Sequence, residues 1–147
     1  MTDLKQLSGP EFLRTWYQRV WADGDRNAIS QMMAPDAQLN GLGSSPIMGP
    51  REFEQLHDAM FAYLEDISIK VEKTLVDGVW TTALCTVKAT SRSNHKTAEM
   101  SGVVVARIED GLVQEGYDSW NFVNLWEELG FLPEGSFERA IKGNIIH

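Results

Sequence analysis

The chain of 147 residues has one cysteine, Cys85, and no long hydrophobic run. A single cysteine excludes an intramolecular disulfide and a zinc site built from several thiolates. No window of the sequence reaches the roughly 20 apolar residues that span a bilayer. The N-terminal residues also lack the apolar segment of a secretory leader. We therefore predict a cytoplasmic protein that makes no contact with membranes.

Basic residues are also scarce, with 13 Lys plus Arg against 21 Asp plus Glu and a net charge of −8. This balance argues against a nucleic-acid partner, because binding to phosphate backbones depends on clustered positive charge. His, Asp and Glu residues do not cluster at metal-ligand spacings, and no glycine-rich phosphate loop follows a predicted strand. The sequence therefore predicts no metal site.

Aromatic residues are plentiful: the chain has five Trp, six Phe and three Tyr, and 43% of its residues are hydrophobic. This composition is typical of a folded globular protein, and the aromatic content favours a large apolar pocket or an apolar interface. Without internal repeats or linkers, the chain is expected to form a single domain over residues 1–147. Its core is expected at about 10–132, followed by a C-terminal tail over 133–147.

The first half of the chain has helical periodicity. Apolar residues at helical spacing predict a helix over 12–21, a short second helix over 28–33 and a third over 50–64. His57 lies within the apolar stripe of the third helix. A brief strand over 37–42 and a Gly/Ser/Pro loop over 43–49 separate the second helix from the third.

In the second half of the chain, apolar and polar residues alternate with a period of two. Strands are expected from residue 67 to the turn at Asp77-Gly78, over 79–90, over 97–108, and over 112–122 after the turn at Asp110-Gly111. A short helical segment around 125–129 follows. Because tight turns join the long strands, we predict an antiparallel meander within an α+β domain. The sheet is expected to be strongly bent, with helices packed on its concave face.

The strand over 79–90 has two different faces. One carries small residues such as Ala83 and Cys85, whereas the other is bulkier and half polar, with Trp80, Leu84 and Lys88. A second face of this kind commonly packs against another subunit. The sequence therefore predicts a homodimer formed through the sheet.

Several segments together resemble a known family. They are Trp16-Tyr17, the turn Met33-Ala-Pro-Asp36, the segment from Met48 to Phe53, and the segment Ile108-Glu-Asp-Gly-Leu-Val-Gln-Glu-Gly-Tyr117. Over residues 10–132 the chain resembles the SnoaL-like polyketide cyclase family of the nuclear transport factor 2-like superfamily. The resemblance implies a cone-shaped α+β barrel (cystatin-like) with a cavity between sheet and helices. It also implies catalysis by an aspartate on the last strand, without a metal or organic cofactor.

When the last-strand segment of the family is aligned with residues 115–121, that aspartate corresponds to Asn121. A second polar group of the family, on the first short strand, falls on Asn40. An amide cannot carry a proton near neutral pH, although it can bind a carbonyl. Asp118 is the nearest ionisable replacement, and burial would raise its pKa. Regular alternation places Asp118 on the face opposite Asn121, so a solvated carboxylate is expected unless a bulge intervenes.

The remaining pocket candidates are residues that could equally belong to a filled core. His57 in particular could be a core or interface histidine rather than a base. These candidates are Trp16, Tyr17, His57, Met60, Phe61, Met100, Tyr117 and Trp120.

The pattern and the resemblance together predict a protein with an apolar pocket for a small hydrophobic ligand. The first hypothesis is cofactor-free acid/base catalysis on a carbonyl compound by cyclisation, isomerisation or hydration. In it, Asp118 carries the proton while Asn121 and Tyr117 polarise the substrate oxygen. The alternative is a non-catalytic binding protein of the same fold that has lost the aspartate at position 121. A purely structural dimerisation module is the least favoured.

Overall fold

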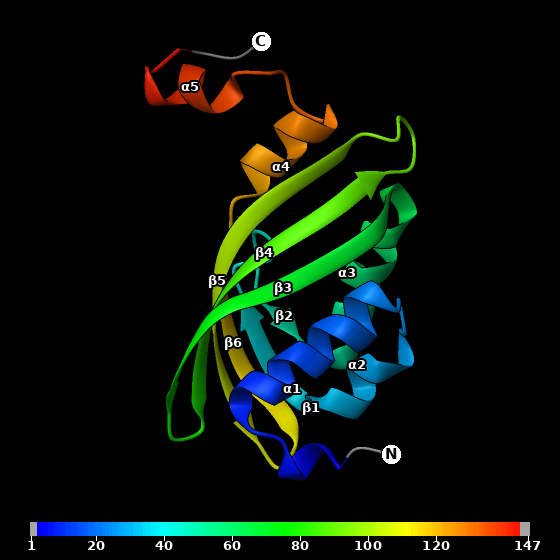
Figure 1. The fold of residues 1–147 in the computed structure, drawn as a ribbon, viewed down its shortest axis with the longest axis vertical. Helices are drawn as coiled ribbons and strands as arrows, with labels where there is room; N and C mark the ends of the chain where they lie inside the picture. The colour runs from blue at the N-terminus through cyan, green and yellow to red at the C-terminus, as the bar shows by residue number, and fades with distance from the viewer. Residues whose placement is uncertain (1–2, 145–147) are drawn as a thin grey trace.

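The computed structural model describes residues 3–144 and consists of one curved sheet with helices on its concave side (Figure 1). The elements, in chain order, are the 3-10 helix η1 (Leu4–Gln6), α1 (Gly9–Trp16), the π-helix η2 (Tyr17–Ala22), α2 (Asn27–Met32), β1 (Met33–Asn40), β2 (Ile47–Met48), α3 (Gly49–Tyr63), β3 (Leu64–Asp77), β4 (Trp80–Ser91), β5 (Thr97–Glu109), β6 (Leu112–Trp120), α4 (Phe122–Leu129) and α5 (Ser136–Ile141).

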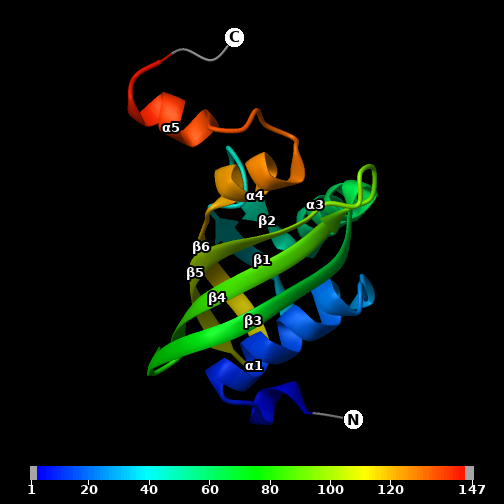
Figure 2. The ribbon, with the colours of Figure 1, turned by 45° about the horizontal axis from the view of Figure 1, so that its top comes forward.

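The six strands form one sheet in the order β2-β1-β6-β5-β4-β3. Strands β3 to β6 are an antiparallel meander, as the two turn signals predicted. The first strand, β1, lies parallel to β6 and brings the early part of the chain beside the last strand. The predicted α+β class and the strongly bent sheet are confirmed, and the fold is the expected cone (Figure 2).

The first helix forms where the sequence supplies both a cap and an apolar face. The hydroxyl of Ser8 accepts a hydrogen bond from the backbone N–H of Glu11 at 3.2 Å, and Pro10 lies in the first turn. The helix then widens into the π-helix η2, where the N–H of Asp23 bonds the carbonyl of Gln18 at 2.7 Å. Together α1 and η2 bury a row of large side chains against the sheet: Phe12, Leu13, Trp16, Tyr17 and Val20.

The small residues of β4 form the face that receives the helices. Ala83 and Cys85 are completely buried, whereas Leu84 between them is 39% exposed on the convex face. At Gly9, the start of α1 comes so close to β4 that an added Cβ would lie 1.8 Å from the hydroxyl oxygen of Thr81. Small side chains on the concave face therefore let α1 approach the sheet directly.

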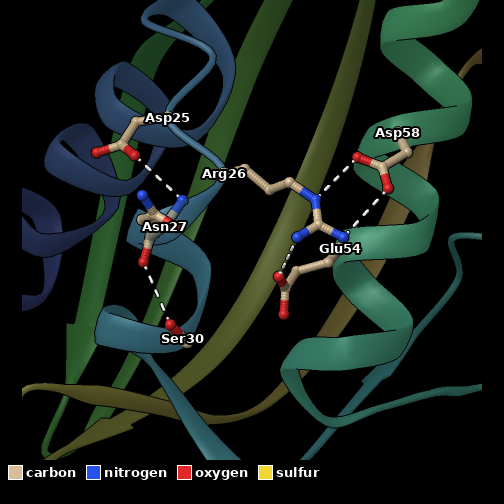
Figure 3. A network of polar contacts seen from close by, with 6 residues as sticks. All are labelled: Asp25, Arg26, Asn27, Ser30, Glu54 and Asp58. Atoms are coloured by element: carbon tan, nitrogen blue, oxygen red, sulfur yellow. Dashed lines mark hydrogen bonds and ion pairs between the residues drawn. The ribbon is translucent and has the colours of Figure 1, made fainter.

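Arg26 joins the beginning of α2 to α3 (Figure 3). Its guanidinium donates to the carboxylate of Glu54 at 2.7 Å and to both oxygens of Asp58, at 2.9 and 3.2 Å. Exposed ion pairs contribute little stability individually, about 1 kcal/mol or less. The bidentate contact nevertheless fixes how α2 lies against α3, beside the concave face.

Several predicted boundaries are wrong. The strand expected over 37–42 is β1, over Met33–Asn40, and the loop expected over 43–49 contains β2. Met33 was placed in the second helix, but it begins β1 and pairs with Val113 of β6, because the chain becomes extended ahead of Pro35. The last strand was expected to reach residue 122, but it ends at Trp120, and Asn121 caps α4.

The chain after α4 leaves the sheet. Part of the expected tail forms α5, which packs near α4 at one end of the molecule (Figures 1 and 2). Residues 145–147 of that tail lie outside the described residues. Within residues 3–144, no helix is both long enough and apolar enough to cross a bilayer.

Candidate active site

A cavity lies between the concave face of the sheet and the helices α1, η2 and α3. Its volume is about 100 Å³. That is several times the roughly 10–15 Å³ needed to hold one water. Within the described part of the chain, its lining is apolar apart from a few polar groups, and Asp118 is the one charged residue. The interior therefore combines a hydrophobic hollow with a single carboxylate.

A β-bulge in β6 determines which side chains face this cavity. On β5, the neighbouring residues Arg107 and Ile108 pair with Glu115 and Val113 of β6, so Gln114 has no opposite residue. One extra residue in a strand reverses the alternation of every side chain that follows. The bulge therefore changes which residues after position 114 point inward.

The consequence is that Asp118 faces the cavity and Asn121 does not. Val113 lines the cavity before the bulge, and Gly116, Asp118 and Trp120 line it afterwards. Regular alternation alone would place Asp118 on the opposite side of the strand, and the bulge is the exception under which the sequence analysis expected it to face inward. Asn121 follows the strand and is exposed.

The surroundings of Asp118 change its acidity. Burial raises the pKa of its carboxyl from 3.8 to about 6, because the charged form loses its hydration. The indole N–H of Trp120 donates a hydrogen bond to Oδ1 of Asp118 at 3.0 Å, which favours the charged form and lowers the pKa. Burial is the larger effect. A pKa of about 6 suits a group that exchanges protons near neutral pH.

Gly102 makes room for the tryptophan that binds Asp118. It pairs with Trp120 across β5 and β6, and a Cβ at position 102 would lie 2.2 Å from Cε3 of the indole. The ring therefore lies directly on the bare backbone of β5. Any side chain at position 102 would displace the ring and its hydrogen bond.

Tyr17 supplies a second polar group to the cavity. Its pKa is raised well above 10, mainly by burial and further by the nearby Cys85 and Asp118. Burial also raises the pKa of the Cys85 thiol, to about 11. The phenol therefore stays protonated at neutral pH and can donate a hydrogen bond into the cavity.

The structure brings only part of the predicted site together. Besides Asp118, five of the predicted pocket residues line the cavity: Trp16, Tyr17, Met60, Met100 and Trp120. These residues come from α1, η2, α3, β5 and β6. Sequence reasoning missed most of the aliphatic lining, which has no signature of its own. It also missed Gly116, although a glycine inside a strand pattern is a signal for a bulge.

The other predicted pocket residues have structural contacts elsewhere, and their placement in the cavity is corrected. Tyr117 is 48% exposed on the convex face, where its hydroxyl donates to Glu115 at 2.8 Å. Its orientation follows from the bulge that turns Asp118 inward. Asn121 caps α4, with its side-chain oxygen accepting from the N–H of Asn124 at 3.3 Å. Both residues lie outside the cavity.

Asn40, His57 and Phe61 are not among the cavity-lining residues either. The amide of Asn40 donates to the carbonyl of Gly116 at 3.2 Å and ties β1 to β6. The buried Nε2 of His57 lies 2.8 Å from the carbonyl of Val20, and its ring centroid lies 4.5 Å from that of Phe61. These contacts hold β1, η2 and α3 in place around the cavity.

Among residues 3–144, no group of three or more His, Cys, Asp or Glu side chains is arranged to hold a metal ion. The expectation of cofactor-free chemistry stays a prediction.

A model of the SnoaL-like domain family matches residues 13–116. No curated protein has a significant sequence match to this chain. The structure is similar to TsrD from Streptomyces laurentii, with a TM-score of 0.73 and 16% identity over 86% of this chain and 100% of that one.

Two further solved structures are similar. IdmH from Streptomyces antibioticus, a proposed polyketide cyclase, has a TM-score of 0.72 and 19% identity over 82% of this chain and 97% of that one. An LEH-like epoxide hydrolase from M. tuberculosis has a TM-score of 0.66 and 14% identity over 90% of this chain and 94% of that one. At these identities the likeness establishes a common fold.

Proposed function

Since the chain belongs to the SnoaL-like domain family, we propose that it binds a small, mainly apolar carbonyl compound and converts it by cofactor-free acid/base chemistry. The observation that supports this proposal is one carboxyl group, Asp118, in an otherwise apolar cavity, with a pKa of about 6. A carboxylate in that environment is poised to take up and return a proton at neutral pH. Cyclisation, isomerisation and hydration are the reactions considered.

In the proposed mechanism, ionised Asp118 removes a proton from the carbon next to the substrate carbonyl. The electron pair of the broken C–H bond forms a C=C bond while the carbonyl π pair moves to the oxygen, and the protonated phenol of Tyr17 donates a hydrogen bond to that oxygen. In an isomerisation, where the substrate has a C=C bond conjugated with this enolate, Asp118 then returns the proton to the far carbon of the conjugated system as the C=O bond re-forms. The apolar lining strengthens the hydrogen bond by excluding water. Tyr17 thus takes the role first assigned to Tyr117 and Asn121.

The structural neighbours are compatible with this class of reaction, because they include a proposed polyketide cyclase and an epoxide hydrolase. The alternative of a non-catalytic binding protein rested on the asparagine at position 121. That residue caps α4 outside the cavity, so its identity does not bear on proton transfer. The resemblance implies a carboxylate on the last strand, and Asp118 meets that description.

Ligand binding in the cavity can be tested by filling the cavity. Ala106 is 2% exposed and lines it from β5, so Ala106→Leu should occupy part of the available volume. We expect an apolar ketone found by thermal-shift screening to bind this variant at least tenfold more weakly than wild type. Native mass spectrometry of the purified protein would reveal any ligand retained from expression.

The matched control is Ala59→Leu, which makes the same change on the exposed surface of α3 and should leave affinity unchanged. Equal affinity in wild type and Ala106→Leu, with circular dichroism showing both folded, would contradict binding in the cavity.

The convex face of the sheet supports a second part of the proposal, a homodimer. Four large apolar side chains are exposed on it: Leu75 at 76%, Leu84 at 39%, Val103 at 39% and Tyr117 at 48%. Leu84 and Val103 lie directly opposite each other on β4 and β5. Apolar side chains gathered on one sheet face favour an isologous interface between two copies.

We expect Val103→Lys to convert the dimer to a monomer, because two symmetry-related lysines would be buried in an apolar interface. Size-exclusion chromatography with light scattering measures the mass directly. Val123→Lys is the control, since Val123 is 37% exposed on α4 rather than on the sheet. A monomeric wild-type protein at tens of micromolar, which is roughly the range in which a weak dimer still forms, would refute the interface.

A further inference from the structure

A polar groove adjoins the cavity where the loop after β1 meets α3. The residues lining it include Leu42, Ser44, Ser45, Arg51, Glu52 and Leu56. Two of these, Leu42 and Leu56, also line the cavity that contains Asp118. The groove and the cavity therefore share a wall formed by two aliphatic side chains, one on the loop and one on the helix.

Among the polar residues of this groove, Arg51 is the one that can only donate hydrogen bonds. Arg51 is exposed, and within residues 3–144 it forms no ion pair and no side-chain hydrogen bond. Ser44 and Ser45 line the same groove, and their hydroxyls can both donate and accept. The one acidic residue, Glu52, has its Oε1 engaged by the backbone N–H of Met48 at 3.0 Å. The groove thus suits a group rich in acceptor oxygens.

A second surface hollow differs from the groove in the charge of its lining and in its relation to the cavity. It lies near β5, α4 and α5, and four of its lining residues are Glu127, Glu128, Glu134 and Glu138. It shares no lining residue with the cavity. The charged side chains lining the groove, Arg51 and Glu52, balance each other, whereas the second hollow carries four glutamates against one lysine. The groove also shares two lining residues with the candidate active site.

We infer that the ligand is an elongated amphipathic molecule with its apolar part in the cavity and an anionic oxygen group, such as a carboxylate, on Arg51. Leu42 and Leu56, which line both the cavity and the groove, lie where the two ends of such a molecule would meet. A guanidinium binds carboxylate-like groups through charge-assisted hydrogen bonds. This inference rests on the proposed function for the apolar end and adds a recognised anionic end, which narrows the substrate class.

Two dyes with one skeleton test the anionic end directly. 1-Anilinonaphthalene-8-sulfonate carries a sulfonate, and N-phenyl-1-naphthylamine is its neutral counterpart. We expect Arg51→Gln to weaken binding of the sulfonate about tenfold, the effect of losing one charge-assisted hydrogen bond near the surface. Binding of the neutral dye should change less than about twofold. Fluorescence titration measures both dissociation constants.

Arg14→Gln is the matched control, because it makes the same charge change at an exposed position on α1. It should leave both constants unchanged. Leu42→Trp adds bulk at a residue that lines both the groove and the cavity, and it should weaken the binding of both dyes. If Arg51→Gln affects both dyes equally or neither of them, the inference is overturned. If the neutral dye does not bind wild type, the proposed cavity site fails as well. If Leu42→Trp weakens binding of the neutral dye but Arg51→Gln does not weaken binding of the sulfonate, the cavity site stands and only the role of Arg51 is refuted.

Discussion

Replacing Asp118 by asparagine is expected to abolish turnover and at the same time to stabilise the folded protein. The asparagine keeps an oxygen that can accept the hydrogen bond from Trp120, but it cannot carry a proton. Loss of a general acid/base group typically lowers rates by roughly 10²–10⁴-fold. The gain in stability follows from the cost of holding a charged carboxylate in an apolar cavity.

The sign of the stability change follows from the pKa of Asp118, which is 3.8 ordinarily and about 6 in the folded protein. Below about pH 3 the carboxyl is protonated in both the folded and the unfolded state, and its ionisation does not affect stability. As the pH rises from about 4 to about 6, the unfolded state ionises more readily, so the wild-type protein loses stability. The loss is complete above this range and amounts to at most about 3 kcal/mol.

Urea unfolding of wild type and Asp118→Asn at several pH values measures this difference without a substrate. The variant should be more stable at pH 7, and its advantage should disappear towards about pH 3. Asp36→Asn makes the same substitution at an exposed position on β1; it is the control and should leave the free energy of unfolding nearly unchanged. A variant with unchanged stability across this range would mean that Asp118 is not a buried ionised group.

Most of the fold could be predicted from the sequence, because its elements carry strong periodic signals. The helix stripe that includes Phe12 and Trp16 and the hairpin turns at Gly78 and Gly111 each depend on residues close together in the chain. The parallel pairing of β1 with β6 could not be predicted in this way. It joins segments separated by most of the chain, and no local pattern of residues encodes it.

The site was harder to predict because it depends on a shift of one residue in the pairing of β6 with β5. With regular alternation, Asn121 shares the face of Val113, and Asp118 faces solvent. The bulge at Gln114 reverses this assignment, and α4 begins before Asn121 could extend the strand. Residue types alone could identify Asp118 as the nearest ionisable group. Its orientation required the hydrogen-bond pairing between β5 and β6.

Gly102→Ala is expected to separate the position of Asp118 from its chemical identity. Gly102 has no left-handed backbone conformation, so alanine can adopt its φ, although the new Cβ would also lie 2.7 Å from the carbonyl oxygen of Ser119 and β6 must shift slightly. The new Cβ would lie 2.2 Å from Cε3 and 2.5 Å from Cδ2 of Trp120, so the indole must move. Overpacking of this kind costs about 1–3 kcal/mol of stability. The displaced indole would no longer donate to Oδ1 of Asp118.

Losing that hydrogen bond should raise the pKa of Asp118 above about 6, because the bond is what opposes the effect of burial. Trp120→Phe removes the same N–H without adding a Cβ and should raise the pKa in the same direction. A ¹³C NMR titration of the Asp118 carboxyl in each protein measures the pKa. Gly43→Ala is the matched control, since no heavy atom lies within 4 Å of its added Cβ. If the pKa of Asp118 rises in both Gly102→Ala and Trp120→Phe but not in the control, the effect is due to loss of the indole N–H. If the pKa is unaltered in both variants, Trp120 does not influence the acidity of the carboxyl.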